Sequence, residues 1–277
     1  MKRLAIVFGM TMLFCTPAFA NEPDAVAVYQ EMEEKTNNMA DLDAYYDFDL
    51  DMEYQKQSIK ASLKMDVKAN HMNVPSECKL GADMNIGVDV SGLYEADELG
   101  PGTGMDLDDT RLDLEAKMYY ADGMYYMDMM GMKFKKQVLM ETMTETIEKV
   151  QSAAGQNNLD YMQDMKLRTE GDVRIISYTM NGEKMSELVN QMMDVINSAA
   201  EMDGYEDEIQ VQIGDISGEY EINSDGYYTK ARLSMVMYLT ENGETMKISL
   251  NGDVALRNPG QPVHLQLPDF SEFELME

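Results

Sequence analysis

The spacing of apolar positions changes near residue 44. Residues 24–39 carry apolar side chains at helical spacing behind Pro23, which predicts an amphipathic helix. Residues 44–54 and 59–67 alternate strictly between apolar and polar positions, which predicts two half-buried strands. A two-residue turn at Lys56-Gln57 would join these strands and place Asp49 opposite Lys64.

The same alternation continues along most of the chain. A third strand is predicted at residues 80–90, before a polar loop at 95–109, and Asp122-Gly123 marks the turn of a further hairpin. Helix-period segments are predicted at 137–154 and 183–200, on either side of a strand pair within 161–180. The remaining predicted strands are residues 208–213, 218–222, 227–239, 245–256 and 263–267.

This order of elements predicts an α+β protein with one strongly curved antiparallel sheet. The sheet should have about ten strands and form a half-barrel, with about three helices packed on its concave face. A long sheet curls, and a curled sheet with one apolar face needs a filling. We expect residues 21–277 to form a single domain because no composition break marks a linker.

The first twenty residues predict a secretory signal peptide. Lys2 and Arg3 precede an apolar stretch, and a small-x-small site predicts cleavage after Ala20. A lipid anchor is not expected, because Cys15 follows Phe14 instead of a small residue. We therefore expect an exported protein, periplasmic or extracellular, and no later apolar run is long enough for a transmembrane segment. Cleavage leaves Cys78 as a lone thiol, to which we assign no role.

Composition narrows the classes of function. The chain has 51 acidic and 22 basic residues, a net charge of −29, which argues against nucleic-acid binding through phosphate neutralisation. Its 44% of hydrophobic residues suffices for a packed core. Two histidines and the absence of nucleophile, zinc or phosphate-loop motifs predict that the protein is not an enzyme and needs no cofactor.

Three stretches suggest a known fold: the helix leading into residues 44–54, the strands that follow Gly218, and the closing PVHLQLPDF at 262–270. Together they resemble the LolA/LppX-like (LppX/LprG-type) fold of bacterial envelope lipid carriers. They are also similar to Met- and Asp-rich exported domains of unknown function that share this half-barrel. Members of the fold hold acylated or lipidic molecules between sheet and helices, so the resemblance implies a similar capacity here.

Methionine is unusually frequent, with 29 residues, and many of these lie at positions that should face the interior. Thioether side chains are flexible, so they can re-pack around variable acyl chains, although they can also fill a plain core. The residues that we expect to line a ligand cavity are Phe48, Leu50, Met52, Leu63, Met65, Met84, Met127, Met129, Met143, Ile147, Met192, Ile196, Met235 and Met237.

Two metal hypotheses carry less weight. The M-x-M spacings at 124–132 and at Met235 and Met237 suit Cu(I), but they follow automatically from strands filled with methionine. The acidic runs near Asp47 and Asp109 do not match a calcium loop and predict a solvated surface. No metal site is therefore expected from the sequence.

The leading hypothesis is an exported, non-enzymatic protein that binds a lipid or another hydrophobic ligand between sheet and helices. The alternative is a packed acidic interaction module of the cell envelope that binds a cationic partner and no small molecule. A methionine-based Cu(I) binder is a minor alternative. Salt separates the first two, because apolar binding should persist at high ionic strength and binding to an acidic surface should not.

Overall fold

The computed structural model describes residues 23–55, 57–74, 76–93, 110–137, 161–199, 210–241 and 243–276, with the side chains of 23 and 191–199 excepted. The described helices are α2 (Pro23–Asn37), α4 (Gly182–Ala199) and the short 3-10 turn η1 (Ser91–Leu93). The strands are β1 (Leu42–Tyr54), β2 (Gln57–Asn70), β3 (Lys79–Asp89), β4 (Arg111–Ala121), β5 (Met124–Met129), β6 (Met132–Gln137), β7 (Met162–Glu170), β8 (Val173–Met180), β9 (Gln210–Ile222), β10 (Tyr228–Glu241), β11 (Glu244–Leu256) and β12 (Glu274–Leu275).

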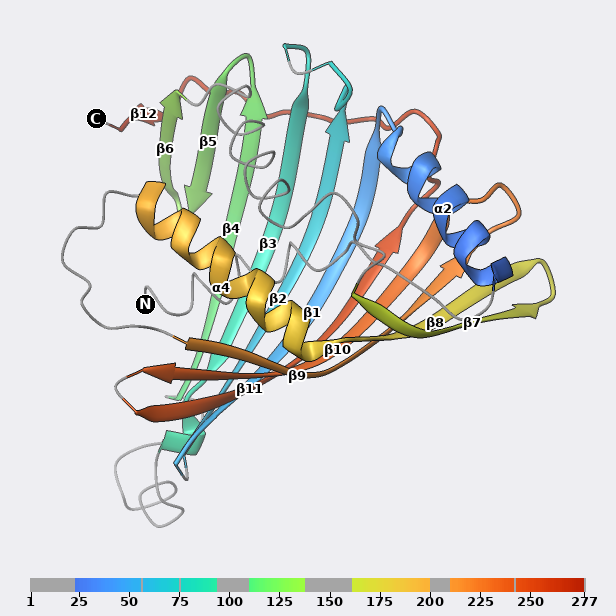
Figure 1. The fold of residues 1–277 in the computed structure, drawn as a ribbon. Coiled ribbons are helices and arrows are strands. Elements are labelled where there is room, and N and C mark those ends of the chain that lie inside the picture. Colours follow the sequence, from blue (N-terminus) through green and yellow to red (C-terminus); the bar gives the residue numbers. More distant parts are fainter. Residues whose placement is uncertain are drawn as a thin grey trace.

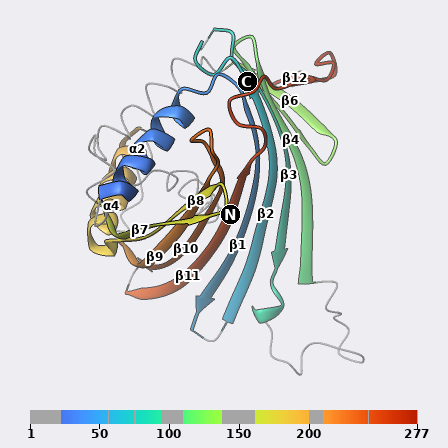
Figure 2. The same ribbon diagram turned by 90° about the vertical axis from the view of Figure 1, so that its right-hand side faces the viewer.

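All these strands belong to one curved sheet (Figure 1), in the order β12-β6-β5-β4-β3-β2-β1-β11-β10-β9-β8-β7. Neighbouring strands are antiparallel except for β12 and β6, which are parallel. The two longer helices lie on the concave side of the sheet (Figure 2). The predicted curved antiparallel sheet is thus confirmed, with twelve strands among the described residues instead of about ten.

The two longer described helices are fixed by specific contacts. On α2, Ala25, Tyr29 and Met32 recur at helical spacing and are buried, while the polar side turns to solvent. Helix α4 begins where the Asn181 side chain accepts a hydrogen bond from the Lys184 amide at 3.0 Å, an N-cap contact. The predicted helices at 24–39 and 183–200 match α2 and α4, whereas most of the one predicted at 137–154 lies outside the described residues.

Side chains of α4 also complete the hydrogen bonds of β9. Strand β8 pairs with β9 only between Ile216 and Ile222. Before that point, the side-chain amide of Asn190 forms two hydrogen bonds with the backbone of Val211. Its Nδ2 donates to the Val211 carbonyl at 2.8 Å, and its Oδ1 accepts from the Val211 backbone amide at 3.0 Å. Ser186 accepts from the Ile213 amide at 2.7 Å. The helix therefore takes the place of a strand at this part of the edge, because buried backbone groups require partners.

The register of the first hairpin differs from the predicted one by two residues. Tyr54 lies opposite Gln57, so Lys64 lies opposite Asp47 and not Asp49. Lys64 Nζ and Asp47 Oδ2 are 3.3 Å apart. A shift of two residues leaves every side chain on its predicted face, because the side-chain period of a strand is two.

Three other boundaries were predicted wrongly. Strand β6 was missed, and its last residue, Gln137, was assigned to a helix. Strand β9 is continuous where two strands were predicted, because an irregularity between Ile213 and Ile216 interrupts the alternation without ending the strand. Residues 263–267 belong to no strand.

Residues 261–273 instead cross the convex side of the sheet, towards β12 at its edge (Figure 1). The Val263 amide donates to Asp41 Oδ2 at 2.9 Å at the start of this segment. Further along, the Phe270 ring stacks on Tyr126 with a centroid distance of 3.7 Å, and Phe273 is buried beside it. We call residues 261–276 the C-terminal strap.

Candidate ligand-binding face

The pairing register places the predicted cavity residues of the strands on one face of the sheet. Leu50 lies opposite Leu250, which in turn lies opposite Met235. In the other direction, Met65 lies opposite Met84, and Met84 shares a cross-strand row with Met129 through Ala116. The residues brought together on this face are Phe48, Leu50, Met52, Leu63, Met65, Met84, Met127, Met129, Met235 and Met237.

The helix residues expected to face them are described only in part. Met143 and Ile147 lie outside the described residues, and Met192 and Ile196 lie on α4 with side chains that are not described. Earlier on α4, Met185 and Val189 are buried in the same cluster as Ile213 of β9.

Burial divides this face into two regions. The packed half is the concave face of β1, β2 and β7–β11; its methionines Met235 and Met237 are each 1% exposed. The methionine half is the concave face of β3–β6, where Ala82, Ala116 and Tyr120 are buried but the methionines are only half-buried, and Met132 is 60% exposed. The methionine half comprises Met84, Ile86, Leu114, Met118, Met127, Met129, Met132 and Phe134.

Several of these residues were absent from the predicted lining. Phe134 and Met132 were missed together with β6, whose signal is the turn Met130-Gly131. Both turn residues have positive φ, 54° and 83°, as a two-residue hairpin turn requires. Glycine after a long methionine run could have revealed this turn from sequence.

Phenolic side chains lie at both ends of the face. The Tyr125 hydroxyl donates to the Met118 sulfur at 2.9 Å, and burial raises the pKa of Tyr125. In the packed half, burial and then the charge of Glu33 raise the pKa of Tyr29. Both phenols are therefore neutral at physiological pH, as a surface for uncharged ligands requires.

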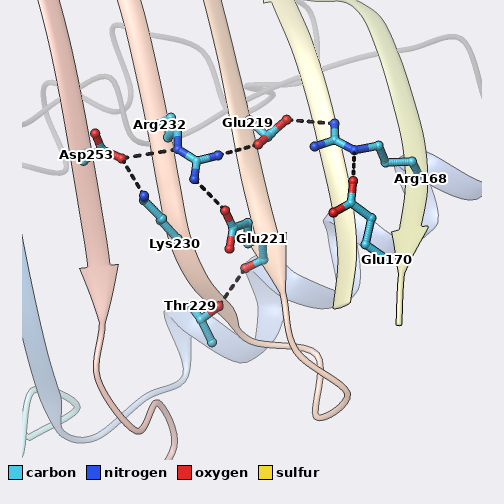
Figure 3. Close-up of polar contacts among 8 residues, drawn as sticks. All are labelled: Arg168, Glu170, Glu219, Glu221, Thr229, Lys230, Arg232 and Asp253. Atoms are coloured by element: carbon cyan, nitrogen blue, oxygen red, sulfur yellow. Dashed lines mark hydrogen bonds and ion pairs between the residues drawn. The ribbon is translucent and has the colours of Figure 1, made fainter. Parts of the chain in front are cut away.

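The convex side of β7–β11 is polar (Figure 3). Arg232 contacts Glu219 at 2.6 Å, Glu221 at 2.8 Å and Asp253 at 3.4 Å. Arg168 extends the network, contacting Glu219 at 2.8 Å and Glu170 at 3.1 Å. The network faces solvent, so each ion pair adds little to stability. Because the network spans several strands, its ion pairs favour the observed strand register over others.

Two features are absent from the described residues. No three His, Cys, Asp or Glu side chains gather there in a way that could hold a metal ion. Neither of the long described helices is sufficiently long and apolar to cross a membrane.

The chain belongs to a family of unknown function (DUF6612), whose model matches residues 24–258. No curated protein matches it. Similar solved structures include LprF from Mycobacterium bovis, with 12% identity over 92% of this chain and 99% of that one, at a TM-score of 0.40. They also include the Mycobacterium tuberculosis lipoprotein LppX, with 8% identity over 89% and 100% of the two chains, at a TM-score of 0.41.

A DUF1329 family protein from Desulfovibrio piger is a further match, with 9% identity over 86% and 95% of the chains, at a TM-score of 0.23. The resemblance to LppX-type proteins noted in the sequence is confirmed by the matches to LprF and LppX. At these TM-scores the likeness carries no information about ligands.

Proposed function

We propose that the chain is a non-enzymatic protein that binds a hydrophobic molecule, such as a lipid acyl chain, against the methionine half. One observation carries this proposal: the methionines on four neighbouring strands lie in register on one face and remain half-buried or exposed, whereas Met52, Met65, Met235 and Met237 on the same face of the adjoining strands are buried. Covering such a face stabilises by about 25 cal/mol per Å² of apolar surface removed from water.

The methionine half is continuous with the protein core. Met84, Ile86 and Val88 pack against the main buried cluster, while Met118 packs against Met65 and its neighbours. A ligand on β3–β6 would therefore extend an existing core across the sheet and need no separate cavity. Flexible thioethers would adapt to chains of different length and unsaturation, so shape would dominate selectivity.

The wider role that we propose is that of a diffusing carrier. The signal peptide predicted at residues 1–20, with cleavage expected after Ala20 and no lipid anchor expected, supports the proposal of an exported protein of the periplasm or the extracellular space. The remaining residues, 21–277, would act as one domain. Such a protein could move lipidic cargo through an aqueous compartment.

The test is a titration of the protein, purified without detergent, with the fluorescent fatty acid cis-parinaric acid. We expect saturable binding that persists in 1 M NaCl, because apolar contacts are not screened. Met127→Gln with Met129→Gln should weaken binding at least about tenfold by placing polar amides on the face.

The matched control is Met130→Gln, which makes the same change in the adjacent turn, where Met130 is 69% exposed. The control should bind like the wild type. Equal binding by a folded Met127→Gln/Met129→Gln protein would reject the site, and the absence of uptake would favour the acidic interaction module with a cationic partner.

A further inference from the structure

Four methionines of the methionine half lie around one point on β5. Met118 is directly opposite Met127 across the β4–β5 pair, and Met129 is directly opposite Met132 across the β5–β6 pair. Met127 and Met129 are two residues apart on β5 and share a face. Of the four, only Met127 and Met129 form an M-x-M pair in the sequence. Strand pairing brings Met118 and Met132 next to them.

The spacing allows the four sulfur atoms to converge. Directly opposite residues have Cβ atoms about 4.5–5.5 Å apart, and residues two apart on a strand are separated by about 6.6 Å. A methionine side chain has three rotatable bonds and can lean across such distances. Four thioethers of adjacent strands can therefore surround a single small ion above β5.

A second M-x-M pair in the same sheet shows why the surroundings matter. Met235 and Met237 of β10 also share a face, but each is 1% exposed and lies opposite aliphatic residues of both neighbouring strands. Their neighbours offer no further sulfur ligands across either pair. The β4–β6 group is half-buried with Met132 exposed, so a metal ion can reach it from solvent.

We propose that Met118, Met127, Met129 and Met132 form a Cu(I) site. Uncharged thioethers are soft ligands and select Cu(I) over hard cations. A chain with a net charge of −29 attracts cations to its vicinity. The inference does not depend on the binding of a hydrophobic ligand.

The test is an anaerobic titration of the protein with Cu(I) held by the chelator bicinchoninate. We expect the wild type to withdraw about one equivalent and X-ray absorption to show sulfur ligands. Loss of a residue that only supports a metal ligand typically weakens metal binding about 10- to 100-fold. Met127→Leu with Met129→Leu removes two direct ligands and should therefore weaken Cu(I) binding by at least this much. Leucine retains apolar volume, so the fold should survive this change, which circular dichroism and urea unfolding check.

The control is Met235→Leu with Met237→Leu, which removes two sulfurs from the packed half and should leave Cu(I) affinity unchanged. Failure of the wild type to withdraw Cu(I) from the chelator would overturn the proposal. So would equal Cu(I) affinity in the wild type and a folded Met127→Leu/Met129→Leu protein. Loss of Cu(I) binding in a folded Met127→Leu/Met129→Leu protein supports the metal site, whereas loss of fatty-acid binding in the glutamine variant bears only on the proposed function.

Discussion

The packed half and the methionine half have the same strand pattern and different surroundings. In the packed half, Tyr220 contacts the rings of Tyr29, Tyr178 and Tyr228, and the adjoining strands contribute fully buried aliphatic residues. In the methionine half, the equivalent face of β4–β6 is half-buried. Alternation therefore identifies which face of a strand is apolar, but not what covers that face.

The outer side of the sheet shows the opposite distribution. Behind the packed half, the convex face carries the partly exposed Arg232 network. Behind the methionine half, the C-terminal strap buries Phe273 against Tyr126 on the convex face. Among the described residues, strands β4–β6 thus receive a buried aromatic cover on their convex face, while their inner methionines stay half-buried or exposed.

The largest expected difference between the halves is in methionine truncation. Met237→Ala should lower the free energy of unfolding by about 2–5 kcal/mol, because the side chain is fully buried and its loss leaves a cavity. Met129→Ala should cost about 1 kcal/mol, because that side chain is already half-exposed. Urea unfolding measures both. Equal losses would show that the two halves are packed alike.

The second expected effect concerns the strap. Phe270→Ala removes the ring stacked on Tyr126 and should cost about 1–3 kcal/mol, less than a fully buried phenylalanine. Hydrogen exchange of the Met276 amide, which donates to the Lys135 carbonyl, should accelerate as β12 detaches. The control is His264→Ala, an exposed change in the same strap. Unchanged exchange in Phe270→Ala would mean that the ring does not hold the strap.

Local signals explain why much of the sheet could be predicted from sequence. The turn at Asp122-Gly123 was identified from its dipeptide, and both residues have the positive φ that the turn requires. The inward face of β1 and β2 was also identified, even though the register was wrong by two residues, because parity is preserved.

The remaining features depend on contacts between distant residues. The PVHLQLPDF segment alternates like a strand, yet it becomes a strap because Phe270 meets Tyr126 and Asp41 binds the Val263 amide. The site was predicted as one cavity lining, whereas burial divides it into two halves. No local pattern distinguishes Met127 from Met237, because the elements that cover a face are set by tertiary structure.

The third prediction compares ion pairs on the outer side of the packed half. Arg232→Ala should cost about 1 kcal/mol, since it removes several partly exposed contacts and leaves Glu219 near Glu221 without their shared cation. Lys247→Ala, which breaks a single pair with Glu53, should cost less than about 0.5 kcal/mol. Thermal unfolding at low and high salt measures both. The difference between the variants should shrink in 1 M NaCl, and an equal difference at both salt concentrations would argue against an electrostatic network.

The smallest effect concerns the point at which the strap is attached, Asp41. The Val263 amide donates to its carboxylate and holds the pKa of Asp41 below its usual range, with a further hydrogen bond from the His71 amide. A carboxyl with a lowered folded-state pKa stabilises the fold fully above its unfolded pKa, near 3.9, and loses this contribution as the pH falls through the folded pKa. Asp41→Asn should therefore be slightly less stable than wild type at pH 7. Its stability should also fall less steeply than that of the wild type as the pH is lowered.

Asp89→Asn is the matched control for Asp41. The pKa of Asp89 is also lowered, by hydrogen bonds from Ser91, but Asp89 lies far from the strap. Both variants should flatten the acid limb of a stability profile, since each removes a carboxyl stabilised in the folded state. Only Asp41→Asn should speed hydrogen exchange at the Val263 amide, because only Asp41 accepts from it. Equal exchange in the two variants would mean that the Asp41 carboxylate does not hold the start of the strap.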